Sequence, residues 1–83
     1  MAKVDPQLAD ALGGDPRVRL DVVVTSAGTL DDLLAVLCDV EVVHVYRLIR
    51  GAAVRGPAAT LRRLADNKAV ASMEPVRRVK HSQ

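Results

Sequence analysis

Residues 40–54, with the sequence VEVVHVYRLIRGAAV, constrain the fold more than any other stretch of the chain. Val, Ile and Tyr dominate its first half, and branched or aromatic side chains fit a pleated, half-buried surface better than a helix. Arg50 and Gly51 follow, and glycine can adopt a positive φ without steric cost. The stretch therefore predicts a β-hairpin with its turn at Arg50-Gly51.

Apolar residues occupy both faces of this predicted hairpin. Strict alternation places Val42, His44, Tyr46 and Leu48 on one face, and Val43, Val45 and Ile49 on the other, which Arg47 interrupts. A sheet with one face on helices and the other in water alternates more cleanly than this. We therefore expect the second face to meet a partner.

The rest of the chain predicts two helices and two more strands. We expect a strand over 17–25, a helix from Thr29 to about Cys38, a helix after Gly56-Pro57 and a last strand over 70–76. Together with the hairpin, the order is β-α-β-β-α-β. This order predicts an α+β, ferredoxin-like fold, in which two helices cover one face of a four-stranded antiparallel sheet.

The first residues predict a short additional helix. Asp5 suits its N-cap, Pro6 its first turn, and Gly13-Gly14 its end. We expect residues 1–16 to form an N-terminal helical appendage, residues 17–76 to form the single domain, and residues 77–83 to form a flexible basic tail.

The composition limits the core and the cellular setting. Hydrophobic residues make up 49% of the 83 residues, but Tyr46 is the only aromatic one, so we expect its burial to contribute a few kcal/mol. Cys38 is the only cysteine, which excludes an intramolecular disulfide and is typical of a reducing compartment. No apolar run has the length of a signal-peptide core or a membrane span. We expect a cytoplasmic protein, although a secreted one trimmed of its leader would have the same pattern.

The charge distribution is asymmetric. Residues 1–41 hold three basic and eight acidic side chains, and residues 42–83 hold nine basic and two acidic ones. A basic half can contact an acidic partner, either a protein or a nucleic acid. A solvated helix face followed by a basic tail is the alternative explanation.

The residues that could carry chemistry are scattered. The candidate nucleophiles and bases are Ser26, Ser72, Ser82, Cys38, His44 and His81. None lies in a recognisable catalytic frame, and we expect Cys38 to be a small, buried or half-buried apolar residue. One Cys and two His have no metal-site spacing, and the glycines match no phosphate-binding fingerprint. We therefore expect no enzymatic activity, no metal and no cofactor.

Two binding functions stay open as alternatives. Some ferredoxin-like domains stack RNA bases on aromatic residues of the sheet, but Tyr46 alone cannot form such a platform. Nucleic acid is therefore an unlikely partner on these residues. A small-molecule regulatory domain that works as a homodimer is the second alternative, and no loop marks its pocket.

Three segments resemble a known family. They are residues 42–54, the following helix with Leu61 and Leu64, and residues 69–75 with the sequence AVASMEP. Together with Val22–Val24 and Asp5–Leu8, they are similar to the propeptide, or inhibitor I9, domain of subtilisin-like serine proteases. The shared pattern is an apolar strand with an aromatic residue, a turn into small residues, a short helix, and a strand that ends in Glu.

The resemblance implies a stand-alone inhibitor, a folding chaperone, or both, for a subtilisin-like protease in trans. Because no apolar run reaches the length of a membrane span, we expect no membrane partner. The sheet would dock on the protease through Val23, Val43 and Val45, and Glu74 would cap two protease helices. The C-terminal tail would enter the active-site cleft like a substrate, through Val79, Lys80, His81, Ser82 and Gln83. A protein-interaction or assembly module without inhibitory activity is the alternative.

Overall fold

The structure is a computed structural model that describes residues 2–76. In chain order it contains β1 (Lys3–Val4), α1 (Pro6–Leu12), β2 (Arg19–Ser26), α2 (Leu30–Ala35), β3 (Glu41–Tyr46), β4 (Gly51–Pro57), α3 (Ala58–Ala65) and β5 (Val70–Pro75). None of the helices in this part of the chain is long and apolar enough to cross a membrane.

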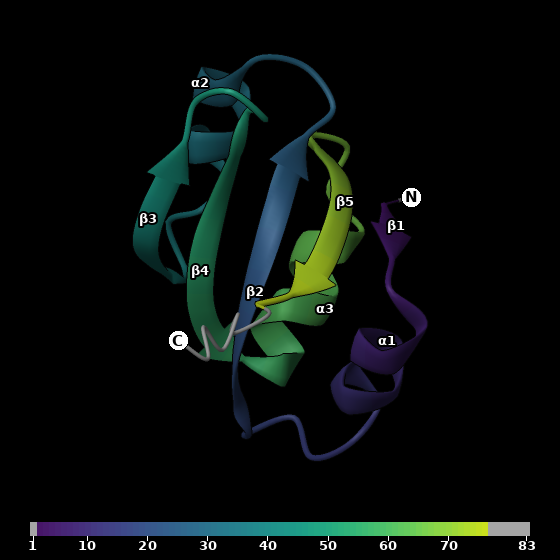
Figure 1. Ribbon diagram of the computed structural model, residues 1–83. Helices are drawn as coiled ribbons and strands as arrows, with labels where there is room; N and C mark the ends of the chain where they lie inside the picture. Colours follow the sequence, from purple (N-terminus) through teal and green to yellow (C-terminus); the bar gives the residue numbers. More distant parts are fainter. Residues whose placement is uncertain (1, 77–83) are drawn as a thin grey trace, which may run out of the picture.

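The strands form one five-stranded sheet with the order β1-β5-β2-β4-β3 (Figure 1). The central strand β2 pairs antiparallel with β4 on one side and with β5 on the other, and β3 pairs antiparallel with β4. β1 pairs parallel with β5. The prediction of an α+β fold is confirmed, but the prediction of a four-stranded, wholly antiparallel sheet is wrong because β1 adds a parallel fifth strand.

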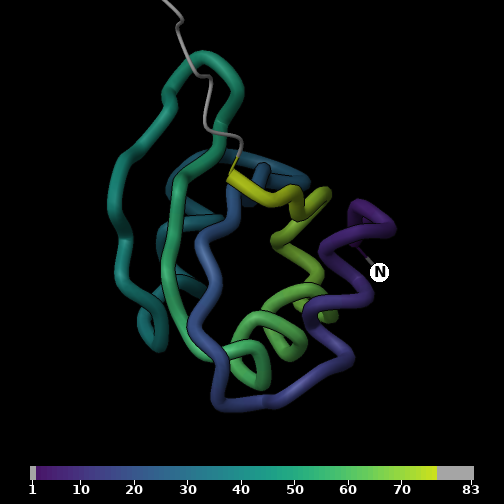
Figure 2. Tube along the Cα trace, turned by 60° about the horizontal axis from the view of Figure 1, so that its bottom comes forward, coloured from purple at the N-terminus to yellow at the C-terminus, as the bar shows by residue number. Residues whose placement is uncertain are grey.

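The core lies between the sheet and the helices, which cover one face of it (Figures 1 and 2). Its fully buried large side chains are Val22 and Val24 from β2, Val54 from β4, Met73 from β5, Leu33 from α2 and Leu61 from α3. β2 supplies alternate residues to this core, as the predicted period of two requires. Val22 and Val24 therefore lie on the helix side of the sheet, and Val23 lies on the other side.

The N-terminal segment belongs to the domain and is not an appendage. Leu8 and Leu12, four residues apart on one side of α1, are buried in the same core as Ala2. The Asp5 backbone N–H donates to the Met73 carbonyl oxygen over 3.1 Å, which joins the segment to β5. A two-residue strand such as β1 has no periodicity, so the sequence could not reveal it.

The two predicted helix starts differ in how they are capped. Thr29 accepts a hydrogen bond from the Asp32 N–H, and the Asp32 side chain accepts one from the Thr29 N–H, which completes a capping box. Asp5 occupies the N-cap position of α1, but its side chain makes no capping hydrogen bond. α2 ends at Ala35, so Cys38 lies beyond it and is exposed, contrary to expectation.

The hairpin turn is built differently from the prediction. β3 ends at Tyr46, so Leu48 and Ile49 lie in the turn, and Arg50 takes the positive φ of 50°. Gly51 has no positive φ. It is required because a Cβ at Gly51 would lie 2.5 Å from the Val24 carbonyl oxygen of the neighbouring strand. The glycine therefore serves the close approach of β4 to β2.

We expect Gly51→Ala to destabilise the protein by about 1–3 kcal/mol, the usual cost of forcing extra volume into a packed site. Gly13→Ala is the matched control, because a Cβ there would lie 3.6 Å from its nearest atoms and Gly13 has a helical φ of −78°. The midpoint of urea unfolding measures both effects. Equal midpoints for the two variants would contradict the close approach.

We expect Leu8→Ala to lower the free energy of unfolding by about 2–4 kcal/mol, because the residue is 4% exposed in the core. Tyr46→Ala is the comparison. Tyr46 is 38% exposed, so the earlier expectation of a few kcal/mol from its burial is replaced by a loss of about 1 kcal/mol. Chemical unfolding of the two variants checks the order, and a larger loss for Tyr46→Ala would contradict it.

Candidate functional site

The face of the sheet opposite the helices is the candidate site, and we call it the open face. On β2 it carries the residues that alternate with the buried valines, and Val23 lies between Ala53 of β4 and Glu74 of β5. The open face includes Arg19, Asp21, Val23, Thr25, Glu41, Val43, His44, Tyr46, Ala53, Arg55, Ser72 and Glu74. Since β2 pairs on both sides, these residues lie on a continuous surface.

A β-bulge decides which residues of β3 reach the open face. The pairing of β3 with β4 shifts between Val42 and His44, so Val43 is an extra residue. Val45 lies opposite Ala52, which is buried on the helix side, whereas His44 and Tyr46 lie opposite Ala53 and Gly51. Directly paired residues share a face of the sheet. The prediction that Val45 belongs to the docking face is therefore wrong.

Because of the bulge, Val43 lies on the same face as His44 and Tyr46, whereas strict alternation would place it on the opposite face. Val43, His44 and Tyr46 line one shallow depression of about 240 Å³ on the open face, together with Ala53 and Val76. The rings of His44 and Tyr46 lie 4.6 Å apart. A one-residue insertion turns the following side chains to the other face, and no residue type marks it in the sequence. His44 and Tyr46 are thus the site residues that sequence reasoning missed.

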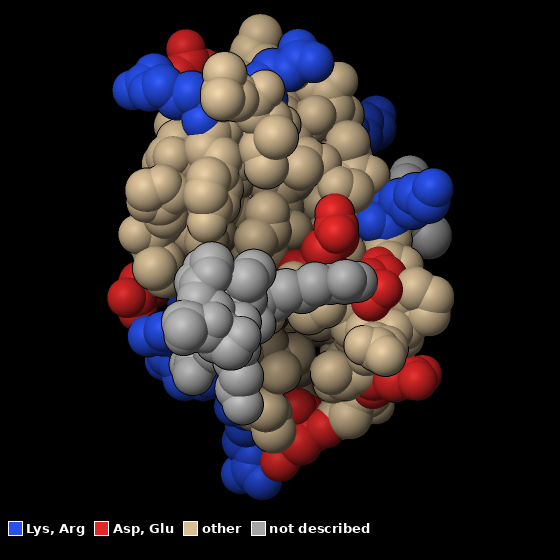
Figure 3. Space-filling model, viewed as in Figure 1, with Lys and Arg blue, Asp and Glu red and all other residues tan. Residues whose placement is uncertain are grey.

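The open face is apolar toward the hairpin turn and charged toward the opposite end. Val43 is 53% exposed and Tyr46 38%. Figure 3 shows a tan surface over the upper part of the strands, with acidic and basic side chains around its margin. Exposed apolar surface of this kind on one face of a sheet is typical of a contact with another protein.

Two ion pairs lie at the charged end of the open face. Arg55 Nε lies 2.6 Å from the Asp21 carboxylate, and Arg19 lies 3.8 Å from Glu41. The hydrogen bond that Arg55 donates to the Asp21 carboxylate, and then the negative charge of that carboxylate, raise the pKa of the Arg55 guanidinium above its ordinary value. The pair joins the neighbouring strands β2 and β4 at this end of the face. These charges neutralise one another and leave the apolar end as the distinctive part of the face.

The β5 side of the open face is polar. Thr25 and Ser72, which are paired across β2 and β5, share a hydrogen bond between their hydroxyl groups. Glu74 is exposed and lies directly opposite Val23. The predicted residues Val23, Val43 and Glu74 therefore do share one face, with Val23 on the central strand.

Two of the candidate nucleophiles, Ser26 and Ser72, are hydrogen-bonded to groups that are not bases. Ser26 donates to the Thr29 carbonyl oxygen over 2.5 Å, and Ser72 is bonded to Thr25. Ser72 on β5 and His44 on β3 are three strand spacings apart, roughly 14 Å. Within the same residues, no group of three or more His, Cys, Asp or Glu side chains could hold a metal ion.

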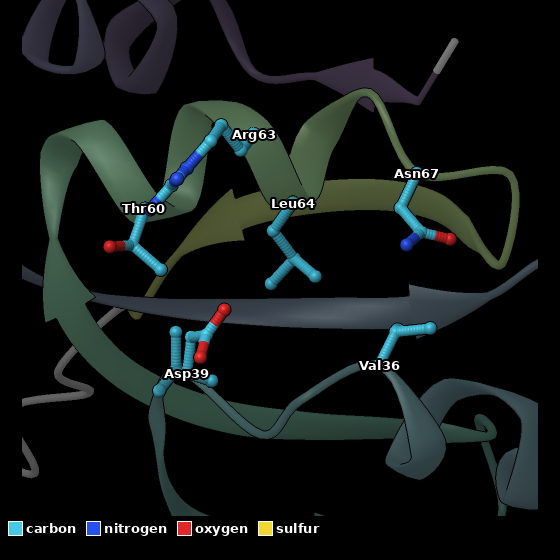
Figure 4. Close-up of a pocket in the computed structure, with 7 residues that line it drawn as sticks. Val36, Asp39, Thr60, Arg63, Leu64 and Asn67 are labelled. Carbon is cyan, nitrogen blue, oxygen red and sulfur yellow. The ribbon is translucent and has the colours of Figure 1, made fainter.

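A small polar pocket lies on the helix side of the sheet, away from the open face. It has a volume of about 170 Å³ and lies between α3 and the segment that follows α2 (Figure 4). Thr60, Arg63 and Asn67 line one side of it, and Val36 and Asp39 line the other. The lining includes a carboxylate and a guanidinium but no nucleophile with an adjacent base, so it supports no catalytic assignment.

The predicted cleft residues Val79, Lys80, His81, Ser82 and Gln83 lie outside the described residues. Comparison of the chain with protein-family models, curated proteins and solved structures returned no match. The functional argument therefore rests on the geometry of the open face and on the sequence resemblance.

We expect Val23→Lys to cost less than about 1 kcal/mol, because the side chain can extend over the open face toward Glu74. Val22→Lys, one residue earlier, should cost about 4 kcal/mol or more, because Val22 is fully buried and has no partner for a charge. Thermal unfolding of the two variants tests which face is open. Similar losses in both would show that something in the chain covers Val23.

Proposed function

We propose that the protein is a stand-alone propeptide-like inhibitor, and a folding chaperone, of a subtilisin-like serine protease, and that it is not an enzyme. The observation that carries this proposal is the one-sided sheet. Its helix side is filled by the protein's own core, whereas the other side carries the exposed Val43 and Tyr46 and the half-buried Val23, which lies opposite Glu74. The resemblance of residues 42–54 and 69–75 to inhibitor I9 domains supports a protease as the partner.

The finer description of the fold belongs to the same proposal. The strands β5-β2-β4-β3, with α2 and α3 on one face, have the connection order and antiparallel pairing of a ferredoxin-like unit. We propose that this unit is the propeptide-like domain and that β1 and α1 extend it at the β5 edge. The extension lies at the opposite edge of the sheet from β3, so it leaves the apolar end of the open face uncovered.

The docking surface differs from the one that the resemblance implied. Val45 faces the helix side, and the bulge supplies His44 and Tyr46 in its place. Burial of Val23, Val43 and Tyr46 against an apolar surface of the protease would provide the main driving force. Glu74 would accept hydrogen bonds from the free N–H groups at protease helix N-termini, where carboxylates are favoured.

The tail would provide the inhibitory contact. In this proposal Val79 to Gln83 enter the active-site cleft as an extended strand that pairs with an edge of the protease by main-chain hydrogen bonds. Docking of the open face raises the effective concentration of the tail at the cleft. Neither part alone should then inhibit as strongly as the whole chain.

Titration of the full chain against subtilisin, with a chromogenic peptide substrate, tests the proposal. We expect competitive inhibition by the full chain, and loss of inhibition by the form truncated after residue 78 with unchanged circular dichroism. Val43→Glu should raise the inhibition constant about tenfold or more, because it places a charge in the buried contact. Val18→Glu is the matched control, since Val18 is 47% exposed and lies before the first residue of β2.

Two results would contradict parts of the proposal. Equal inhibition by the truncated form would exclude the tail mechanism and leave docking alone. No inhibition by the full chain would exclude the inhibitor role, and the open face would then serve a non-inhibitory assembly or interaction partner.

A further inference from the structure

The apolar surface continues past the open face onto the end of the β3–β4 hairpin. We call residues 47–50 the hairpin tip. The Leu48 side chain is 101% exposed and Ile49 is 54% exposed, so neither contributes substantially to the core. Figure 2 shows the hairpin extending from the body of the molecule at this end. The tip therefore presents apolar side chains on a convex projection.

The backbone holds the tip in one conformation. The Arg50 N–H donates to the Arg47 carbonyl oxygen over 3.2 Å, and the Arg50 carbonyl oxygen accepts from the Ser26 N–H over 2.8 Å. Arg50 has a φ of 50°, a left-handed conformation that residues other than glycine rarely adopt. Arg50 thus occupies a position where glycine would be less strained. In this turn the Leu48 side chain points into solvent.

Two arginines flank these apolar side chains in the sequence. Arg47 and Arg50 flank Leu48 and Ile49 and are exposed, and the chain has no Asp or Glu from residue 42 to residue 65. Figure 3 shows basic side chains on both sides of a tan surface at the top of the molecule, with an acidic side chain behind one of them. The first turn of α2, at the same end of the molecule, carries Asp31 and Asp32.

We propose that the hairpin tip attaches the protein reversibly to anionic lipid surfaces. Apolar side chains between cationic ones are the pattern of segments that lie at a membrane interface, with the apolar groups at the acyl boundary and the cations among the head groups. A protein partner would need an apolar pocket rimmed by carboxylates to match a convex tip, whereas an anionic bilayer provides both features everywhere. Such attachment needs no membrane-spanning segment, so it departs from the expectation of no membrane partner, which rested on the lack of an apolar run of that length.

A second copy of the chain is a less suitable occupant of this region. The exposed edge of β3 could pair with another strand, but the bulge at Val43 interrupts the ladder, and bulges are a common means of blocking edge-to-edge pairing. The lipid proposal goes beyond the proposed function and does not depend on it, since the tip lies beyond the paired residues of the open face.

Co-sedimentation of the full chain with vesicles tests the proposal. Phosphatidylcholine vesicles are compared with vesicles in which phosphatidylglycerol replaces about a third of the lipid, since the cations should respond to anionic head groups. We expect binding to the anionic vesicles only, weakened by high salt. L48S/I49S should lower the partition coefficient about tenfold or more through lost apolar insertion, and R47E/R50E by a similar factor through charge reversal.

Matched controls separate the tip from general charge effects. R62E/R63E makes the same change in net charge on exposed positions of α3, and Leu34→Ser removes a leucine that is 37% exposed on α2. Both should bind anionic vesicles within about twofold of the unaltered chain, since they leave the inserting residues intact. Inhibition of subtilisin, if present, should be unchanged in L48S/I49S.

Any of three results would overturn the proposal. The first is no sedimentation of the unaltered chain with anionic vesicles, and the second is an equal loss in R62E/R63E and R47E/R50E. The third is self-association in sedimentation velocity that L48S/I49S abolishes while vesicle binding persists, which would assign the tip to contacts between copies of the chain.

Discussion

The central strand β2 is the element on which the rest of the structure depends. It pairs with β4 and β5 along its length, and its residues Val22 and Val24 are fully buried between the sheet and the helices. Its alternate residues, including Val23, must then lie on the other face, because successive strand side chains point to opposite sides. The existence of an open face thus follows from the way the core is built.

Small residues on β4 make this arrangement compact. Ala52 and Ala53 lie directly opposite Val24 and Val23, and Gly51 approaches the Val24 carbonyl oxygen too closely for any side chain. This close approach lies at the first residue of β4, directly after the turn that contains Arg50, with its positive φ, and the exposed Leu48.

The open face and the hairpin tip differ in the kinds of side chain that they expose. The apolar end of the open face suits a protein contact of the kind proposed for a protease, and the hairpin tip beyond it combines apolar and cationic side chains. The opposite end of the open face carries the Asp21–Arg55 and Arg19–Glu41 ion pairs. Such a division lets variants at Val43 and at Leu48 report on separate functions.

The sequence by itself indicated the helices α2 and α3 and the strands β2 to β5, because periods of two and of about 3.6 follow directly from backbone geometry. The family resemblance also grouped Val23, Val43 and Glu74, which share one face of the sheet. Only the tertiary structure decided three features: the β1 pairing with β5, the bulge at Val43, and the burial of Leu8 and Leu12. Each depends on contacts between residues far apart in the chain, and such contacts leave no local pattern. The bulge has the largest consequence, since it places Val45 on the helix side and His44 and Tyr46 on the open face.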